Sequence, residues 1–193
     1  MYNPAASLTG GKLGKNVDRR YRFGVLGALA SAQAKKQENN LKIVTGLPNE
    51  GWTLVFDAPG YKIDASGLQP DGRDYFLATN PSTNVTISVY LEKVSGKATE
   101  DGCKDNREQR LSPDLGYKEN IDKRESTGMT ILEYTIAEFK GVPLQQRNLF
   151  ACMAKDDVYV DIHLSKALFK ASQEKLFSTV LDSAHFVNKT SSN

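Results

Sequence analysis

Apolar and polar residues alternate along much of the chain beyond residue 50, and this period of two predicts β-strands. The clearest run has an apolar residue at every second position: Val85, Ile87, Val89 and Leu91. Shorter apolar runs end at clusters of glycine, proline, asparagine or aspartate, which are typical of turns. The pattern predicts strands over residues 52–56, 61–65, 75–79, 85–91, 117–126, 128–139, 142–153 and 157–165.

Two stretches lack this alternation and predict helices. Residues 98–111 hold no proline and many charges, and Cys103, Arg107 and Leu111 recur every four residues. Near the C-terminus, Ser172 is a candidate N-cap for a second helix over 172–183. Its apolar face is formed by Leu176, Phe177, Val180 and Leu181. We therefore expect an α+β domain, in which an antiparallel β-sheet is flanked by a mid-chain helix and a C-terminal helix.

Two short turns set an expected register for the last three strands. A two-residue hairpin at 140–141 and another at 155–156 each fix the pairing of the strands that flank them. Counting outward makes Glu133, Asn148 and His163 lateral neighbours on one face. The opposite face gathers an apolar layer, which the C-terminal helix should cover: Leu132, Tyr134, Leu149, Ala151, Met153, Val158, Val160, Ile162 and Leu164. A slip of one residue would invert both faces.

The row of Glu133, Asn148 and His163 is the candidate site, with Gln146 and Ser165 beside it. A carboxylate next to an imidazole orients the ring and raises its pKa, which suits acid–base chemistry. No nucleophile motif such as G-x-S-x-G accompanies the row. Three interpretations stay open, namely a solvated polar row, a surface that binds a ligand or partner, and a catalytic group. The sequence favours the two that involve no catalysis.

The two cysteines, Cys103 and Cys152, predict a disulfide if the protein is exported. Cys152 falls on the mixed face of the last strands, so the helix that carries Cys103 should lie over that face. The alternative is a pair of buried free thiols. Neither cysteine has a zinc-like spacing to a histidine, so we expect no metal site. The glycine-rich run 10–15 lacks the spacing of a phosphate loop, and no motif predicts a cofactor.

Charge is unevenly distributed along the chain. The sequence carries 25 Lys and Arg against 23 Asp and Glu, for a net charge of +2. Residues 1–34 hold five of the basic residues and one of the acidic ones, so the remainder carries 20 against 22, a net charge of −2. The body therefore lacks the positive excess that nucleic-acid binding requires.

The N-terminal segment is typical of a secretory signal. A basic stretch at 19–22 precedes eight mostly apolar residues at 23–30 and an A-x-A sequence at 32–34. The alternative is an amphipathic helix that docks on the domain. We expect an exported protein, periplasmic or extracellular, with no membrane span in the mature chain. The expected organisation is a leader over 1–34, a linker over 35–50, one domain over 51–188 and a polar tail over 189–193.

Several local features occur in a familiar order. They are Phe56-x-x-Pro59-x-Tyr61, the strand 85–91 after a turn, the mid-chain helix, and Leu176-Phe177-x-x-Val180-Leu181 running to Phe186-Val187. Over about residues 50–187 this order resembles the PsbP-like fold, known from the extrinsic photosystem II protein and from a Ran-binding nuclear import factor. The resemblance implies an α-β-α arrangement; a plain two-layer α+β sandwich is the alternative.

The resemblance also implies a non-enzymatic binding or accessory role, although no motif allows a functional residue to be carried over. The sequence thus predicts an exported binding or accessory domain whose partner is an unidentified protein or small ligand. The alternative is a cell-envelope hydrolase built on His163 and Glu133.

Overall fold

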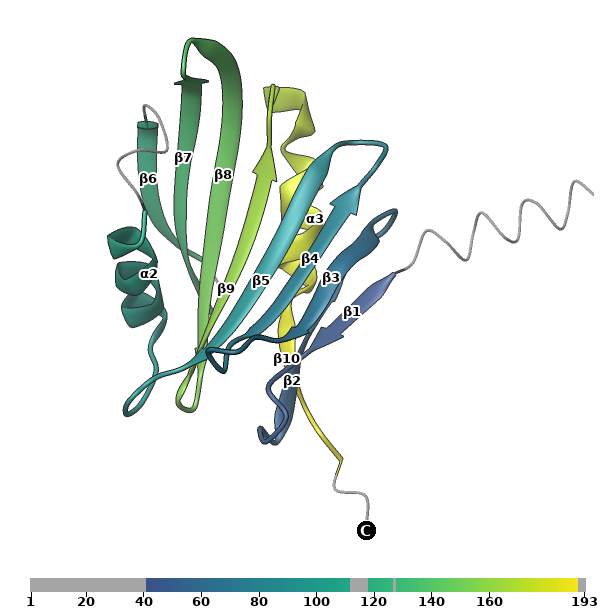
Figure 1. Ribbon diagram of the computed structural model, residues 1–193, viewed down its shortest axis with the longest axis vertical. Coiled ribbons are helices and arrows are strands. Elements are labelled where there is room, and N and C mark those ends of the chain that lie inside the picture. Colours follow the sequence, from purple (N-terminus) through teal and green to yellow (C-terminus); the bar gives the residue numbers. More distant parts are fainter. Residues whose placement is uncertain (1–40, 112–117, 127, 191–193) are drawn as a thin grey trace, which may run out of the picture. The chain divides into compact units, whose positions relative to one another are not determined.

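The alternating segments of the chain form a seven-stranded antiparallel sheet (Figure 1). The computed structural model describes residues 41–111, 118–126 and 128–190. In spatial order the strands are β3 (Lys62–Leu68), β4 (Asp74–Asn80), β5 (Val85–Lys93), β9 (Val158–Lys166), β8 (Val142–Lys155), β7 (Met129–Phe139) and β6 (Lys118–Ser126). In β5 and β9, apolar residues at every second position are fully buried, as the alternation predicts.

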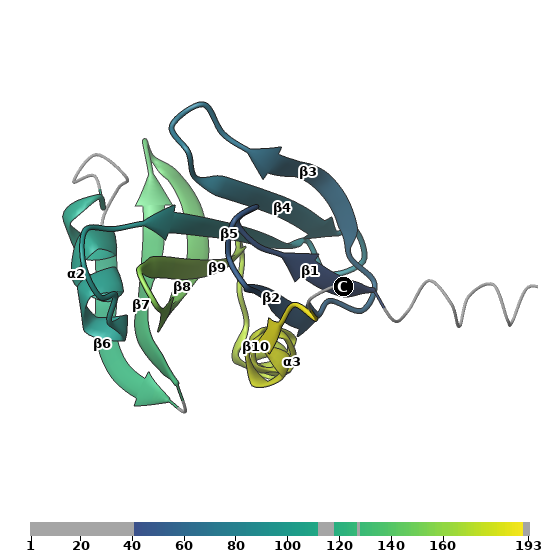
Figure 2. The ribbon, with the colours of Figure 1, turned by 90° about the horizontal axis from the view of Figure 1, so that it is seen from below.

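A small sheet and a helix cover one face of the main sheet (Figure 2). The small sheet has the order β1 (Lys42–Thr45), β2 (Trp52–Asp57) and β10 (His185–Asn188). The helix is α3 (Lys175–Ser183), which follows a 3-10 turn, η1 (Ala171–Gln173). Phe177, Val180 and Leu181 of α3 pack with the apolar residues of both sheets in the larger core cluster.

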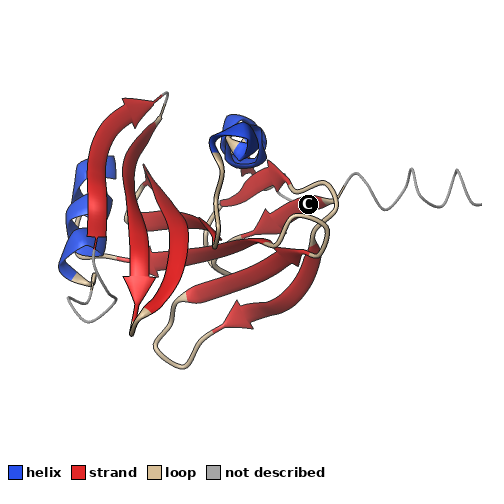
Figure 3. Ribbon diagram, turned by 90° about the horizontal axis from the view of Figure 1, so that it is seen from above, coloured by secondary structure: helices blue, strands red, loops and turns tan. Residues whose placement is uncertain are grey.

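The mid-chain helix, α2 (Glu100–Gln109), lies on the other face of the main sheet, so that the main sheet separates the two helices (Figures 2 and 3). Thr99 caps its N-terminus, since its side chain accepts a hydrogen bond from the Gly102 N–H at 3.1 Å. Cys103 is the buried residue of this helix. The expected arrangement of a sheet between a mid-chain and a C-terminal helix is therefore confirmed.

The register of β7 and β8 differs from the expected one. Pairing starts as predicted between Phe139 and Val142, but a β-bulge then places an extra residue in β8. Gln145 has φ of +42° at this point, a backbone conformation that non-glycine residues rarely adopt. Beyond the bulge Tyr134 pairs with Asn148, a shift of one residue. Because such a shift exchanges the faces of a strand, the predicted faces of β7 are wrong.

The side chains of β7 accordingly contribute to two clusters. On the α2 face, a small apolar cluster forms instead of the expected layer under the C-terminal helix: Leu132, Tyr134, Ile136 and Phe150. On the α3 face, Met129 and Ile131 join the main core.

The register of β8 and β9 is shifted by two residues. The turn occupies 156–157, so Lys155 pairs with Val158, and Asp156 takes φ of +57°. A shift of two keeps every side chain on its predicted face. The apolar layer of these two strands is therefore buried as expected: Leu149, Ala151, Met153, Val158, Val160, Ile162 and Leu164. Asn148, however, pairs with Ser165 and not with His163.

Two details of the fold differ from those expected, and one strand was not predicted. The predicted linker over 35–50 overlaps the fold, because 42–45 form β1 and Ile43 is buried. The chain after α3 forms β10, a strand that was not predicted. Ser172 lies in the 3-10 turn and does not cap α3. The two missed strands are four residues long, too short for a period of two to stand out. The predicted leader lies outside the described residues.

Candidate functional site

Four of the five predicted site residues lie on the face of the main sheet that α2 covers. Asn148 pairs with Ser165 across β8 and β9, and His163 is one diagonal step away. The Asn148 Oδ1 accepts a hydrogen bond from Gln146 Nε2 at 2.9 Å and lies 3.2 Å from His163 Nε2. The contact between Asn148 and His163 thus exists, although the two residues are not directly opposite.

His163 is held as a neutral ring. An amide oxygen can only accept, so the Nε2 that faces Asn148 carries the proton, and Nδ1 accepts from the Ser88 hydroxyl at 3.5 Å. The ring stacks on Phe150 with 4.0 Å between centroids and 6° between planes. Burial, helped by the positive charge of Arg107, lowers the pKa of His163 to about 3.

Glu133, the fifth predicted residue, lies on the opposite face. The bulge in β8 places it on the α3 side, where its carboxylate accepts hydrogen bonds from Arg147 and Arg124. Arg147 also pairs with Glu174, just before α3. The expected neighbour relation between Glu133 and His163 is therefore wrong, and the catalytic alternative loses the carboxylate on which it depended.

A polar pocket of about 230 Å³ lies beneath α2. His163 and Ser88 form part of its wall, which connects the predicted row to the pocket. The remaining lining residues come from α2 and its C-cap, from β5 and β9, and from the residue before β4: Cys103, Asn106, Arg107, Arg110, Tyr90, Glu92, Tyr159, Asp161 and Arg73. The sequence did not reveal them, because their gathering depends on which strands α2 crosses.

An incompletely satisfied ion pair lies beside this pocket. Asp161 Oδ2 is 3.4 Å from Arg107 Nε, and the side chains are 13% and 24% exposed. Burial raises the pKa of Asp161 to about 6, against the opposing effect of Arg107 and Arg110. Arg107 Nε and Asp161 Oδ1 are buried and have no hydrogen-bond partner among the described residues. Buried polar atoms normally find a partner in protein, water or ligand.

A larger pocket of about 770 Å³ adjoins the first, since Arg73, Glu92 and Arg110 line both. Its other walls come from the turn at 47–50, from 71–72, and from Leu68 and Lys93. Arg110 binds both carboxylate oxygens of Glu92 at 2.8 Å. The three shared residues form what we call the rim between the pockets.

The two cysteines are neighbours but are not bonded in the structure. Both are free and buried, at 3% exposure for Cys103 and 0% for Cys152, and they are not at disulfide distance. A hydrogen bond with Cys152, followed by burial, raises the pKa of the Cys103 thiol. The thiol of Cys103 also points to the Val160 carbonyl, 3.6 Å away. The prediction that the Cys103 helix covers the face of Cys152 is confirmed.

Comparison with known proteins identifies the fold. No family model and no curated protein matches the sequence. Among solved structures, the chain is similar to the solution structure of cyanobacterial PsbP (CyanoP) from Synechocystis sp. PCC 6803, with a TM-score of 0.51 and 16% identity, covering 89% of this chain and 99% of that one. The chain has a PsbP-like fold. The resemblance drawn from the order of elements is therefore confirmed, and at this identity it concerns the fold alone.

The described part of the PsbP-like domain shows neither a cluster of metal-ligating side chains nor a helix able to cross a membrane. Among the described residues, no group of three or more His, Cys, Asp or Glu side chains is placed to hold a metal ion. The helices within the same residues are too short or too polar to cross a membrane.

Proposed function

We propose that this PsbP-like chain is an exported, non-catalytic accessory domain that binds a small polar ligand in the pocket beneath α2. The observation that carries the proposal is the Arg107–Asp161 pair, which borders the pocket and in which Arg107 Nε and Asp161 Oδ1 are buried without a hydrogen bond, the ion-pair distance being 3.4 Å. Leaving such atoms unpaired is unfavourable, and a ligand or ordered water that reaches them recovers the lost hydrogen bonds.

The packing of α2 supports a binding role. A helix that only protects a sheet normally presents an apolar stripe to it. In α2 the buried residue is Cys103, and its neighbours over the pocket are the polar Asn106, Arg107 and, just past the helix, Arg110. The contact between α2 and the sheet is therefore partly polar, which is the composition expected of a wall that faces a polar ligand.

The electrostatics of His163 favour binding over acid–base catalysis. A general base works best when its pKa is near the operating pH, whereas that of His163 is lowered to about 3. Its partners, Asn148 and Ser88, are neutral and supply no negative charge to stabilise an imidazolium. We therefore infer that the row of Gln146, Asn148 and His163 has a structural role. Its hydrogen bonds hold the sheet surface beside the pocket in place.

Ligand binding is tested on the full chain by two-dimensional NMR during titration with a library of small polar fragments. Shifts confined to backbone amides around Tyr90, Arg107 and Asp161 are expected for at least one fragment. Asp161→Ala should abolish those shifts, whereas Asp182→Ala, which removes an exposed carboxylate on α3, should preserve them. A library that leaves the pocket amides unmoved in the folded protein contradicts the proposal.

Export is supported by the basic, apolar and A-x-A segments of residues 19–34. Residues 1–40 fused to a reporter that is active only outside the cytoplasm should produce activity. The matched control replaces Leu26 and Leu29, in the apolar segment, with Asp, and should produce none. Equal activity from the two fusions, or none from either, overturns the export part of the proposal.

A further inference from the structure

We propose that the ligand of this pocket carries an anionic group, a carboxylate or a phosphate, which binds at the rim between Arg73 and Arg110. This inference rests on the proposed function, because it specifies the chemistry of the ligand at the same pocket. Three observations carry it: the accessibility of the two guanidinium groups, the balance of charge around the pocket, and the rigid support of Arg73.

The two arginines occupy the boundary between the pockets and remain accessible. Arg73 immediately precedes β4, and Arg110 is the C-cap of α2, so they approach the rim from different parts of the fold. Their side chains are 33% and 42% exposed, compared with 24% for the deeper Arg107. Both guanidinium groups are therefore more accessible to a ligand than that of Arg107.

The residues that line the smaller pocket carry one more positive charge than negative charges, and Asp71, which pairs with Arg73, belongs to the lining of the larger pocket. The lining of the smaller pocket includes three guanidinium groups, from Arg73, Arg107 and Arg110, against the two carboxylates of Glu92 and Asp161. The hydrogen bonds to Glu92 raise the pKa of Arg110, and the positive charge of Arg73 opposes that rise. An anion placed between the guanidinium groups of Arg73 and Arg110 would relieve the repulsion between their like charges, and guanidinium donors match the geometry of carboxylate and phosphate.

The existing partners of the two arginines do not prevent this binding. Arg73 donates Nε and Nη2 to Asp71, whose side chain is 51% exposed, and Arg110 pairs with Glu92. Exposed ion pairs contribute little to stability because water competes for both charges. A ligand anion can therefore share these donors or replace one carboxylate without disturbing the core.

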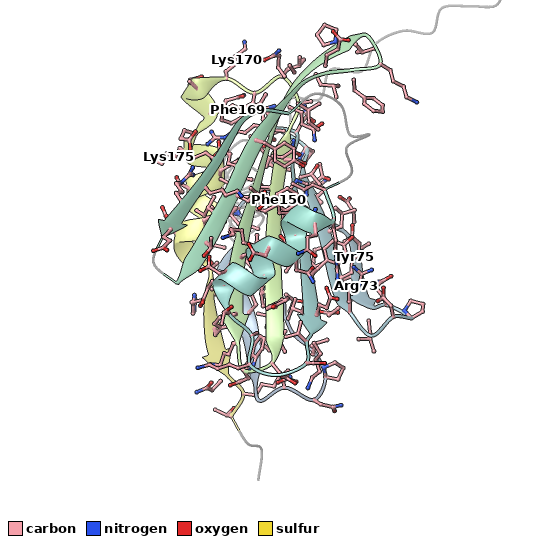
Figure 4. All side chains as sticks on the ribbon, turned by 90° about the vertical axis from the view of Figure 1, so that its left-hand side faces the viewer. Arg73, Tyr75, Phe150, Phe169, Lys170 and Lys175 are labelled. Carbon is pink, nitrogen blue, oxygen red and sulfur yellow. The ribbon has the colours of Figure 1, made fainter. Side chains whose placement is uncertain are left out.

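The guanidinium of Arg73 has a rigid support. It lies over the ring of Tyr90, 5.3 Å from the ring centroid, and Tyr90 packs on Tyr75 with 4.7 Å between centroids. Figure 4 shows Arg73 and Tyr75 beside α2, on the side of the sheet that the helix leaves partly uncovered. Holding the guanidinium against a ring reduces the entropy that Arg73 loses when an anion binds.

The test compares benzoate with benzamide, its neutral counterpart of the same shape, and adds inorganic phosphate as a separate probe. Affinity is measured on the full chain by NMR titration, with the Nε–H signals of the arginines as reporters. We expect benzoate or phosphate to bind and benzamide to bind at least about tenfold more weakly, the effect of losing one charged hydrogen bond. The stronger of the two anions identifies the chemical class.

Three variants locate the binding. Arg73→Gln and Arg110→Gln should each weaken anion binding by about tenfold, and the corresponding Lys variants should retain part of it because they keep the charge. Arg124→Gln is the matched control, since Arg124 is 41% exposed and pairs with two carboxylates away from this rim. Circular dichroism confirms that each variant is folded.

The possible failures are distinguishable. If benzamide binds as tightly as the anions, or if both Gln variants bind the anions normally, the ligand is not held by its charge at this rim and the inference fails. If neutral fragments move the pocket signals while neither anion does, the inference fails and the proposed function stands. If no probe of either kind moves them, both fail.

Discussion

His163 Nε2 lies 3.2 Å from Asn148 Oδ1, and this contact joins two residues 15 positions apart into one floor beneath α2. Its direction is fixed by chemistry, since the Asn148 oxygen also accepts from Gln146 and has no proton to offer. The ring therefore works as a donor toward β8 and as an acceptor toward Ser88 of β5. The contact spans three adjacent strands, and burial together with the positive charge of Arg107 keeps the imidazole neutral.

The lowered pKa of His163 predicts a loss of stability in acid. The folded-state pKa of His163 is about 3, below the ordinary value of 6.5. Its contribution is fully present above pH 6.5 and declines as the pH falls toward 3, because the unfolded chain binds a proton that the native chain excludes. Between pH 7 and pH 4.5 this residue alone should lower the free energy of unfolding by about 2–3 kcal/mol.

Urea denaturation at several pH values measures this effect. His163→Gln should show a smaller fall in unfolding free energy on acidification than the natural protein, whatever its stability at pH 7. His185→Gln, which alters the exposed histidine of β10, is the control. Parallel pH profiles for the natural protein and His163→Gln would show that the ring is not held neutral.

Asp161 should have the opposite pH dependence. Its pKa is raised from 3.8 to about 6, so the native chain holds a proton more tightly than the unfolded chain does. Between these two values the contribution of Asp161 to stability falls as the pH rises, by up to about 3 kcal/mol. The effects of His163 and Asp161 on the pH dependence of stability thus oppose each other between pH 4 and pH 6.

Replacing Asp161 with Asn removes this titration. Relative to the natural protein, Asp161→Asn should gain stability steadily as the pH rises from 4 to 7, measured by urea unfolding at matched ionic strength. Asp182→Asn, on the exposed side of α3, serves as the control. A stability difference that does not change with pH would mean that Asp161 is more solvated than its burial indicates.

The strands and helices could be predicted because periodicity reports burial directly. Val85 to Leu91 alternate in sequence and are buried alternately in the fold, and the apolar face of α3 is the one that meets the core. The register could not be predicted in full. Nothing in a polar Gln145 signals a bulge with positive φ, yet that single residue moved Glu133 to the other face.

From the sequence, the candidate site could be predicted only for those of its residues that lie in strands. Asn148 and His163 could be placed on one face because an error of two residues preserves the face, whereas the error of one in β7 did not. The pairing of Arg107 with Asp161 could not be predicted in this way. Their meeting depends on how a helix crosses a sheet, and neither helical nor strand periodicity specifies that crossing.

The close approach of α2 to β9 depends on Gly102. A Cβ at this position would lie 2.4 Å from Tyr159 Oη, closer than any normal contact. Ala in place of Gly usually stabilises a helix, but here we expect Gly102→Ala to destabilise the protein by about 1–3 kcal/mol because it forces α2 away from the sheet. Thermal and urea unfolding measure the effect.

A second substitution tests the cause. Tyr159→Phe removes the hydroxyl that collides, so Gly102→Ala should cost less stability in the Tyr159→Phe background than in the natural one. Gly51→Ala, at a glycine with no atom within 4 Å of the built Cβ, is the control. Additive effects of the two changes would show that the hydroxyl does not limit the approach.

The paired thiols give the last prediction, which applies if the protein is exported as proposed above. Cys103 and Cys152 are buried neighbours in the reduced structure, although they are not at disulfide distance, so bonding requires the two sulfur atoms to approach each other. A bond that closes a loop of about 50 residues should stabilise the fold by roughly 4 kcal/mol in the chain-entropy model.

Material secreted into an oxidising compartment should therefore have an intact mass lower by two hydrogen atoms than the reduced protein. It should also unfold at a higher urea concentration than Cys152→Ser does. Secreted, folded protein in which both thiols can still be alkylated after denaturation would overturn the predicted disulfide.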